Sequence, residues 1–357
     1  MNRRDNITGW RPFQADLKSP HVWITNPIRW DHVVFWIISF VLLIQVGTIN
    51  RSGMLDYENY INYFRETDLN WFINFFSSQK NNLSLLFGFF TEEFLWRIWA
   101  LTLGLFFSEE QSVLVTVLLL NFLIILALSK TSRPLFGILL WILIPPALAT
   151  IGTFQIRQGF SFAILLYMTL SLRRPILGCF IAATIHTTFA IILVYSLIFK
   201  VFKNQSIRLL IIYLLVSLLL TIIGNQLFHD YGGRRAEQYS IQEGAASINY
   251  VIGSLICSVS SFIYLIQSKK KLTLITELAA VHIGCIFFIV FSWFFLPIGT
   301  SRNGYFALLF LMVIIPEIQK RNYFTWSLWG LTLIYLTYII MKAYFVDGDY
   351  DELLQAW

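Results

Sequence analysis

The chain carries a few costly polar side chains beside or inside long apolar runs. Arg157 and Gln158 open one such run, and His186 interrupts the next run near its middle. Arginine and histidine are expensive in an apolar environment, so they usually mark functional positions there. A guanidinium can bind phosphate oxygens through two parallel hydrogen bonds, and an imidazole can donate or accept a proton. The stretch from Arg157 to Lys203 is therefore the first candidate for a functional site.

Charged residues in other segments could join this stretch if the fold brings them together. They are Asp56, Glu92, Arg234, Arg235 and Arg302. Several arginines that converge from separate loops form the pattern expected for a phosphate or pyrophosphate ligand. A neighbouring histidine or carboxylate can remove a proton from a hydroxyl nucleophile. Such a site needs no metal, and no spacing of His, Asp and Glu in the sequence is typical of a metal centre.

Each arginine also has an alternative structural role. Arg157, at the start of a span, could simply reach the lipid headgroups with its charged end. Arg234 and Arg235 could form a solvated pair in a loop, and Arg302 could cap a turn. These structural roles explain each arginine taken singly better than they explain all of the arginines taken together. We therefore keep the shared anion site as the preferred interpretation.

The histidines and acidic residues have alternatives of the same kind. His186 could be a core histidine hydrogen-bonded to a threonine or a carbonyl. Asp56 could only cap and anchor a surface helix, and Glu92 or Glu93 could cap a short one. His282 lies in the middle of an apolar run without an obvious partner, so a structural role is preferred for it.

The elements that must position these residues are membrane helices. The chain has 357 residues, of which 57% are hydrophobic and 13% are charged. A soluble domain has about twice that charged fraction. The three cysteines lie in apolar runs and are interpreted as packing thiols, and no aromatic and basic pattern of a nucleic-acid partner is present. We expect an all-α, polytopic integral membrane protein that forms a single membrane domain over residues 1–357.

Charge bias assigns sides to the segments. The basic segment 1–31 predicts a cytoplasmic N-terminus, with Trp residues at the membrane interface. Segment 51–110 is predicted to form amphipathic or re-entrant helices on the outer side, including a short helix at 94–107. Residues 226–246 form an outer loop, and residues 345–357 form an acidic outer tail in this topology. The topology has about eleven crossings, counting two short arms of a hairpin.

That hairpin follows from two basic clusters. Arg173 and Arg174 precede an apolar run that closes at Lys200, and both clusters are expected to be cytoplasmic. One straight helix would place one cluster on the wrong side. Two short helices with a bend near His186 satisfy both clusters, and broken helices are tolerated where they line a cavity. The bend places His186 on the same side as Arg157.

These residues resemble the core pattern of the EpsG-like branch of the Wzy-type bacterial polysaccharide polymerases. The matching motifs are Arg157-Gln158-x4-Ala163, Arg173/Arg174 and Ala182-Ala183-x2-His186-Thr187. Weaker marks of the same group are Asp56-x3-Tyr60, the Glu92 region, Arg235-x3-Tyr239 and Arg302-x2-Tyr305. The doublet Glu92-Glu93 is a departure, because related sequences tend to show Glu-Pro there.

The resemblance implies a membrane glycosyltransferase of the GT-C kind in the bacterial inner membrane. Such a polymerase transfers a growing glycan from undecaprenyl pyrophosphate to another lipid-linked repeat unit on the periplasmic face. Its product is the O-antigen of lipopolysaccharide, a capsule or an exopolysaccharide, and the reaction is expected to need neither a metal nor a cofactor. A flippase delivers the repeat units, and a co-polymerase sets the chain length.

In this interpretation the arginines bind the two lipid-linked substrates. Arg157 and Arg302 would hold the donor pyrophosphate, and Arg234 or Arg235 the second unit or the leaving group. His186 would act as a base or as an orienting donor. Asp56 and Glu92 are candidates for hydrogen bonds to the sugars or for the catalytic base. Gln158, Tyr239 and Tyr305 are candidates for substrate binding.

Two rival functions remain. An O-antigen ligase, or another glycosyltransferase that uses lipid-linked sugars, would be favoured by a large outer loop with an acidic pair, whereas the outer loops here are modest. A flippase or transporter would be favoured by inverted repeats and charges at mid-membrane. No repeat is found in the sequence, and its charges gather at one predicted face.

Overall fold

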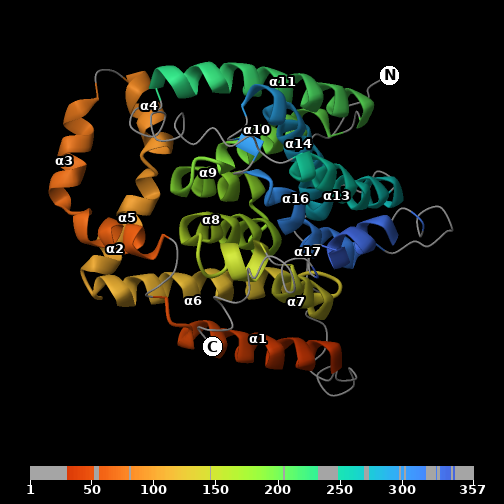
Figure 1. The fold of residues 1–357 in the computed structure, drawn as a ribbon, viewed down its shortest axis with the longest axis horizontal. Coiled ribbons are helices and arrows are strands. Elements are labelled where there is room, and N and C mark those ends of the chain that lie inside the picture. The colour runs from red at the N-terminus through yellow and green to blue at the C-terminus, as the bar shows by residue number, and fades with distance from the viewer. Residues whose placement is uncertain are drawn as a thin grey trace, which may run out of the picture.

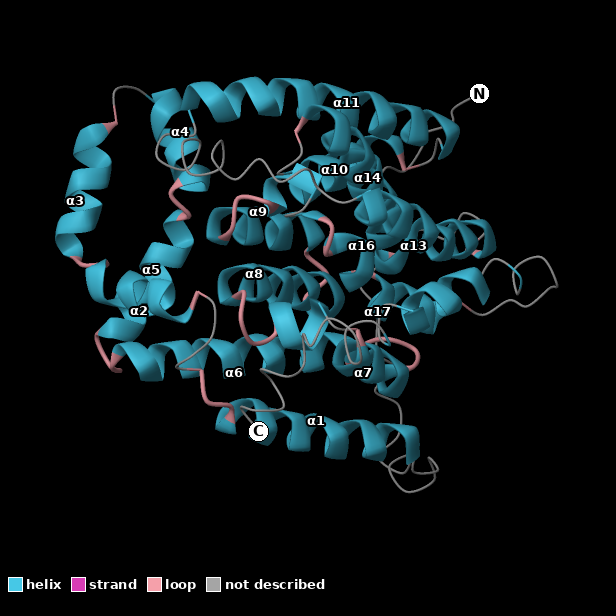
Figure 2. Ribbon diagram, viewed as in Figure 1, coloured by secondary structure: helices cyan, strands magenta, loops and turns pink. Residues whose placement is uncertain are grey.

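The computed structural model is a stack of helices with a smaller helical arm at one edge (Figure 1). It describes residues 30–51, 56–79, 82–144, 146–203, 206–231, 248–268, 273–296, 299–300, 303–318, 327, 330–338 and 341. No strand occurs among these residues (Figure 2). The predicted all-α class is therefore confirmed for the described part of the chain.

The helices keep close to the apolar runs of the sequence. They are α1 (Trp30–Thr48), α2 (Tyr57–Glu66), α3 (Leu69–Ser78), α4 (Asn82–Thr91), α5 (Phe94–Gly104), α6 (Glu109–Leu128), α7 (Pro134–Leu143), α8 (Ile156–Leu166), α9 (Pro175–Ile185), α10 (Phe189–Phe202), α11 (Ser206–Tyr231), α13 (Ile248–Gln267), α14 (Leu274–Phe295), α16 (Phe306–Leu309) and α17 (Leu311–Ile314). Two π-helical segments occupy Pro146–Ile151 and Tyr167–Ser171, and a 3-10 turn occupies Ile315–Glu317. The first of these segments confirms the break that the two prolines after α7 predict.

Four of the described helices are long and apolar enough to cross a membrane. These are α1, α6, the stretch Ile207–Gln226 of α11, and α14. Five other apolar helices among the described residues are shorter than a usual span. The structure is thus that of a multi-pass helical membrane protein, while the count of eleven crossings stays a prediction.

The central layers follow the chain from α6 to α14. Helix α6 packs against α8, α8 against α9, α9 against α10, and α10 against α14, while α1 covers α6 and α7 (Figure 1). Their shared interior buries large side chains such as Trp141, Phe162 and Tyr195. A capping box at Ser108 and Gln111 fixes the start of α6, whose first turn is acidic. Close packing of this kind holds α8 and α9 in fixed positions.

The predicted hairpin is present. Helix α9 ends at Ile185, α10 begins at Phe189, and the two helices pack against each other. His186 lies in the bend between them with an extended backbone. Pro175 begins α9, where a proline costs no helical hydrogen bond. The sequence therefore located both the hairpin and the residue at its bend.

Helices α2 to α5 form the arm at the edge of the stack. Helix α2 packs on α5 and α6, and both α4 and α5 contact α9 (Figure 1). The polar and apolar faces of α2 are separated, because Tyr60, Ile61 and Phe64 are buried while Glu58 and Arg65 are exposed. Helix α5 is as short as the sequence predicts for 94–107. The side of the membrane on which the arm lies stays a prediction.

Several predicted features lie outside the described residues. They are nearly all of the N-terminal segment 1–31, most of the loop 226–246, the tail 345–357, and the site candidates Arg234, Arg235, Tyr239 and Arg302.

Candidate functional site

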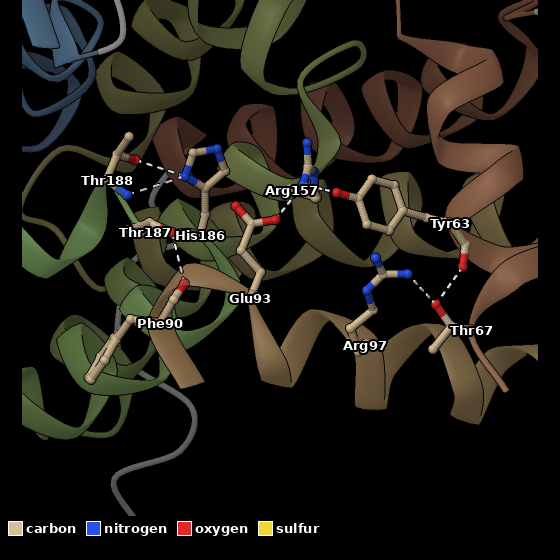
Figure 3. A network of polar contacts seen from close by, with 9 residues as sticks. All are labelled: Tyr63, Thr67, Phe90, Glu93, Arg97, Arg157, His186, Thr187 and Thr188. Atoms are coloured by element: carbon tan, nitrogen blue, oxygen red, sulfur yellow. Dashed lines mark hydrogen bonds and ion pairs between the residues drawn. The ribbon is translucent and has the colours of Figure 1, made fainter. Parts of the chain in front are cut away.

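Arg157 and Glu93 meet where the helical arm joins the stack. Nη1 of Arg157 donates to Oε2 of Glu93 and, at 2.9 Å, to the hydroxyl of Tyr63 (Figure 3). The Glu93 side chain is 2% exposed, while that of Arg157 is 21% exposed. A buried carboxylate therefore holds an arginine that can still be reached from one side.

Glu93 reaches this place through a left-handed backbone turn. It precedes α5 with φ at 54°, a conformation that side chains other than glycine adopt only at a cost. The turn directs Glu93 inward, whereas the preceding Glu92 is exposed. The structure thus resolves the Glu92-Glu93 doublet in favour of Glu93 as the partner of Arg157. Glu92 lies next to the site without being buried in it.

Arg97 lies one helical turn after Glu93 and faces the same cluster. Its Nη1 donates to Oγ1 of Thr67 at 2.8 Å. Its guanidinium stacks over the rings of Tyr63, at 4.3 Å from the centroid, and Trp71, at 4.9 Å. Stacking of this kind favours a cation when water is excluded. Arg97 is thus a second ordered cation beside Arg157.

The aromatic face of α2 supports both arginines. The Arg157 guanidinium lies 4.6 Å from the centroid of Tyr63 and 5.8 Å from that of Tyr60. Burial raises the pKa of Tyr60 to about 12, although Arg157 opposes this shift, so the phenol is neutral at physiological pH. Asp56 lies one turn earlier, exposed, and accepts from Asn59 at 2.9 Å. Asp56 is therefore at the rim of the cluster.

His186 reaches the same region from the hairpin bend. Its Nδ1 accepts from the backbone N–H of Thr188 at 3.4 Å and lies 2.9 Å from the hydroxyl of that residue. A backbone N–H can only donate, so the neutral ring carries its proton on Nε2. Oγ1 of Thr187 donates to the carbonyl of Phe90 at 2.8 Å and ties the bend to the end of α4 (Figure 3). In this state His186 is better suited to donate a hydrogen bond than to act as a base.

A buried amide sets the position at which α8 begins. Asn121 on α6 donates to the carbonyl of Gly152 at 2.9 Å and accepts from Nε1 of Trp141 at 3.1 Å. Gly159 then packs so closely on the carbonyl of Ile151 that a Cβ atom would lie 2.0 Å from that oxygen. These contacts fix the turn between α7 and α8. Arg157 consequently enters the site from a rigid first helical turn.

Two further predicted residues flank this region. Gln158 is buried on α8 next to Arg157. Tyr305 is half-buried just before α16, and its neighbour Phe306 stacks edge-on against Phe189, 5.0 Å away between centroids. Because Phe189 follows the His186 bend, the segment that holds Tyr305 lies close to the bend. The structure therefore places the segment around Tyr305 beside the bend that holds His186.

His282 has the structural role that the sequence favours. It is fully buried in α14, where Nδ1 meets the Ser261 hydroxyl at 2.6 Å and Nε2 meets the Ala307 carbonyl at 3.0 Å. Both ring nitrogens are thus used to connect α13, α14 and α16. The preference for a structural His282 is confirmed.

Sequence reasoning missed Arg97, Tyr63 and Trp71, and it left Glu93 undecided. A usable signal was present, since Glu93 and Arg97 are four residues apart at the start of a short apolar helix. Tyr60 and Tyr63 share one face of α2. The contact between these two segments depends on tertiary packing and has no signal in the local sequence.

The cluster has the chemistry of an anion site. The guanidinium of Arg157 pairs with the buried Glu93 carboxylate, and that of Arg97 stacks on the neighbouring Tyr63 ring. Nε of each arginine is buried without a hydrogen-bond partner among the described residues. Arg157 also sits in the first turn of α8, where the helix dipole adds positive potential. Fold and site together define a multi-pass helical membrane protein with an arginine, carboxylate and histidine cluster at one end of its bundle.

The EpsG family model matches residues 33–355, and the chain belongs to the EpsG family. The family indicates a glycosyltransferase-like polymerase related to exopolysaccharide synthesis. No curated protein and no solved structure matches the chain. The resemblance to EpsG-like polymerases is therefore confirmed at the level of the family.

Proposed function

We propose that this protein polymerises a bacterial surface polysaccharide from lipid-linked repeat units. It transfers the growing glycan from undecaprenyl pyrophosphate to the terminal sugar of a second lipid-linked unit. The reaction takes place on the periplasmic face of the inner membrane, with the N-terminus in the cytoplasm. The product is an O-antigen, a capsule or an exopolysaccharide. A flippase and a chain-length co-polymerase are the expected partners.

The observation that carries the proposal is the Arg157 cluster at the end of the α9–α10 hairpin. A diphosphate is the anionic part of the donor, and arginines bind phosphate oxygens with directed hydrogen bonds. Arg157 is partly exposed and uses Nη1 for Glu93 and Tyr63. A phosphate that approaches from the open side can bind the guanidinium without first displacing a buried partner.

The other residues have roles that their positions suggest. Arg302, Arg234 or Arg235 would bring further positive charge to the donor pyrophosphate or to the second lipid-linked unit. Gln158, Tyr239 and Tyr305 would contribute substrate contacts. Asp56 and Glu92 would bind sugar hydroxyls or accept the proton of the attacking hydroxyl. His186 would orient the leaving oxygen or the acceptor through a proton on Nε2.

Charge distribution supports the proposed face. Helices α6 and α8 begin at the end of the bundle where the cluster lies, and they run towards basic pairs at Lys130/Arg133 and Arg173/Arg174. Lys200 and Lys203 end α10 in the same way. The positive-inside rule assigns such basic ends to the cytoplasm, which leaves the cluster on the opposite face.

Cells that carry Arg157→Ala or His186→Ala test the site. We expect each to lose long-chain polysaccharide and to accumulate single-repeat glycolipid, because donor binding and orientation fail. Arg65→Ala is the matched control, since the Arg65 side chain is 62% exposed and its ion pair within the described chain is with Glu109 at the surface. Normal chain lengths in both site variants, at wild-type protein levels, would contradict the assignment.

Purified protein and a defined lipid-linked repeat unit test the reaction itself. Polymer should form equally well with and without EDTA if the reaction needs no metal. Transfer of finished polymer to a lipid core, without polymerisation, would instead identify a ligase. Loss of all surface sugar in a deletion strain, with lipid-linked units trapped on the cytoplasmic face, would identify a flippase.

A further inference from the structure

Arg97 is an ordered cation that makes no ion pair with any carboxylate in the described part of the chain. Its guanidinium instead contacts Thr67, Tyr63 and Trp71. Its Nε is buried and makes no hydrogen bond within the described chain. A guanidinium of this kind is stabilised by aromatic faces while its charge stays available to an anion.

Tyr63 brings this cation next to Arg157. The two guanidinium carbons lie 4.3 Å and 4.6 Å from the centroid of the same ring. Both guanidiniums therefore lie within stacking distance of the same Tyr63 ring, which makes them close neighbours. Figure 3 shows Arg157 at the hydroxyl end of Tyr63 and Arg97 beside the same ring, with Glu93 reaching in from the turn before α5. The spacing suits two linked phosphates better than a single one.

The local charge also favours a ligand with more than one negative group. The buried Glu93 carboxylate pairs with Arg157, and Arg97 makes no ion pair with a described carboxylate. Like charges held this close repel each other, and an anion that contacts both of them relieves the repulsion. A diphosphate supplies several oxygens at the separation that the two cations need.

We propose that Arg97 is a second phosphate-binding residue, and that Arg97 and Arg157 together hold the two phosphates of a diphosphate across Tyr63. This inference rests on the proposed function, because it names the group of the lipid-linked donor that the cluster binds. Arg97 contacts one phosphate and Arg157 the other. Thr67 fixes the Arg97 side chain in its bound orientation before the ligand arrives.

Calorimetric titration of the purified full-length protein tests this site. The protein is placed in phosphatidylcholine nanodiscs with EDTA and titrated with inorganic pyrophosphate and with inorganic phosphate. We expect wild-type protein to prefer pyrophosphate. Arg97→Gln should weaken pyrophosphate binding roughly tenfold or more while changing phosphate binding much less, because Arg157 alone still binds one phosphate. A wild-type protein without this preference would overturn the proposal.

Two further variants separate binding from folding. Arg97→Lys keeps the charge and loses the planar guanidinium, so it should fold and still lose most of the pyrophosphate preference. Arg65→Gln removes one positive charge from the exposed surface of α2 and should bind pyrophosphate as the wild type does. If Arg97→Lys and Arg97→Gln both keep the wild-type preference, Arg97 is not part of the site.

Two further assays, of polymerisation and of lipid competition, separate the role of Arg97 from the proposed function on which it rests. If wild-type protein and both Arg97 variants polymerise with equal KM, the proposed function stands and the role of Arg97 is wrong. If wild-type protein binds pyrophosphate through Arg97 and polymerises nothing, the diphosphate site stands and the proposed reaction is wrong. The last assay repeats the pyrophosphate titration in nanodiscs that contain increasing amounts of phosphatidylglycerol. If this lipid competes for the site as strongly as pyrophosphate does, the site binds lipid headgroups and the proposal is wrong.

Discussion

Glu93 determines how Arg157 is presented. The carboxylate is almost fully buried, and it reaches the guanidinium only because the backbone turns left-handed before α5. A buried ion pair is costly to form and still more costly to break from one side, since the remaining charge is left without a partner. The neighbouring Glu92 has the same chemistry and is exposed. The two positions should therefore respond very differently to the same substitution.

We expect Glu93→Gln to lower the free energy of unfolding by about 3 kcal/mol, because it leaves Arg157 without its carboxylate. Glu92→Gln, which removes an exposed charge, should change it by less than about 0.5 kcal/mol. Thermal unfolding of both purified variants in detergent is the measurement. Equal melting temperatures would show that the Glu93–Arg157 contact contributes nothing to stability.

At the scale of elements, the start of α8 controls the direction of Arg157. The turn before α8 is held by Asn121, and Gly159 lies against the carbonyl of Ile151 with no room for a side chain. Any Cβ atom at Gly159 must push α8 away from the preceding π-helical segment. Such a shift moves Arg157 relative to the arm without changing any residue of the site.

Gly159→Ala should therefore cost about 1–3 kcal/mol of stability and also reduce polymerisation. Gly330→Ala is the control, because no atom lies within 4 Å of a Cβ there and alanine is the better helix former. Melting temperature and polymer yield are measured for both. A Gly159→Ala protein with wild-type yield would show that the start of α8 does not position the site.

At the scale of the whole molecule, the helices separate two kinds of charge. Basic residues gather at the ends of α6, α8 and α10, and the arginine and carboxylate cluster lies at the opposite ends. Antiparallel packing of short helices produces this separation even where a helix is too short for a usual span. The orientation in the membrane then decides which face meets the substrates.

Cysteine labelling determines that orientation. Thr91→Cys places an exposed thiol beside the His186 bend, and Arg174→Cys places one at the basic end of α9. The three native cysteines are buried, so background labelling should be low. A membrane-impermeant reagent should label position 91 in intact cells and position 174 only after permeabilisation. The reverse pattern would place the cluster in the cytoplasm.

Periodicity and charge allowed much of the architecture to be predicted from sequence. The apolar runs predicted the long helices, because a chain in a bilayer must satisfy its backbone hydrogen bonds internally. Two basic clusters about 25 residues apart predicted the α9–α10 hairpin and the position of His186 in its bend. Exact helix lengths could not be predicted, since packing decides where each helix ends.

The sequence by itself determined the class of protein and its hairpin, and it singled out Arg157 as a candidate, because these follow from local hydrophobicity and from the cost of charge in an apolar environment. Only the tertiary structure decided which groups surround Arg157. The left-handed backbone of Glu93 directs this residue, rather than Glu92, towards Arg157. Arg97 lies in the cluster because α5 packs against α2. Contacts between residues far apart in the chain arise from packing, and no local pattern of residue types contains them.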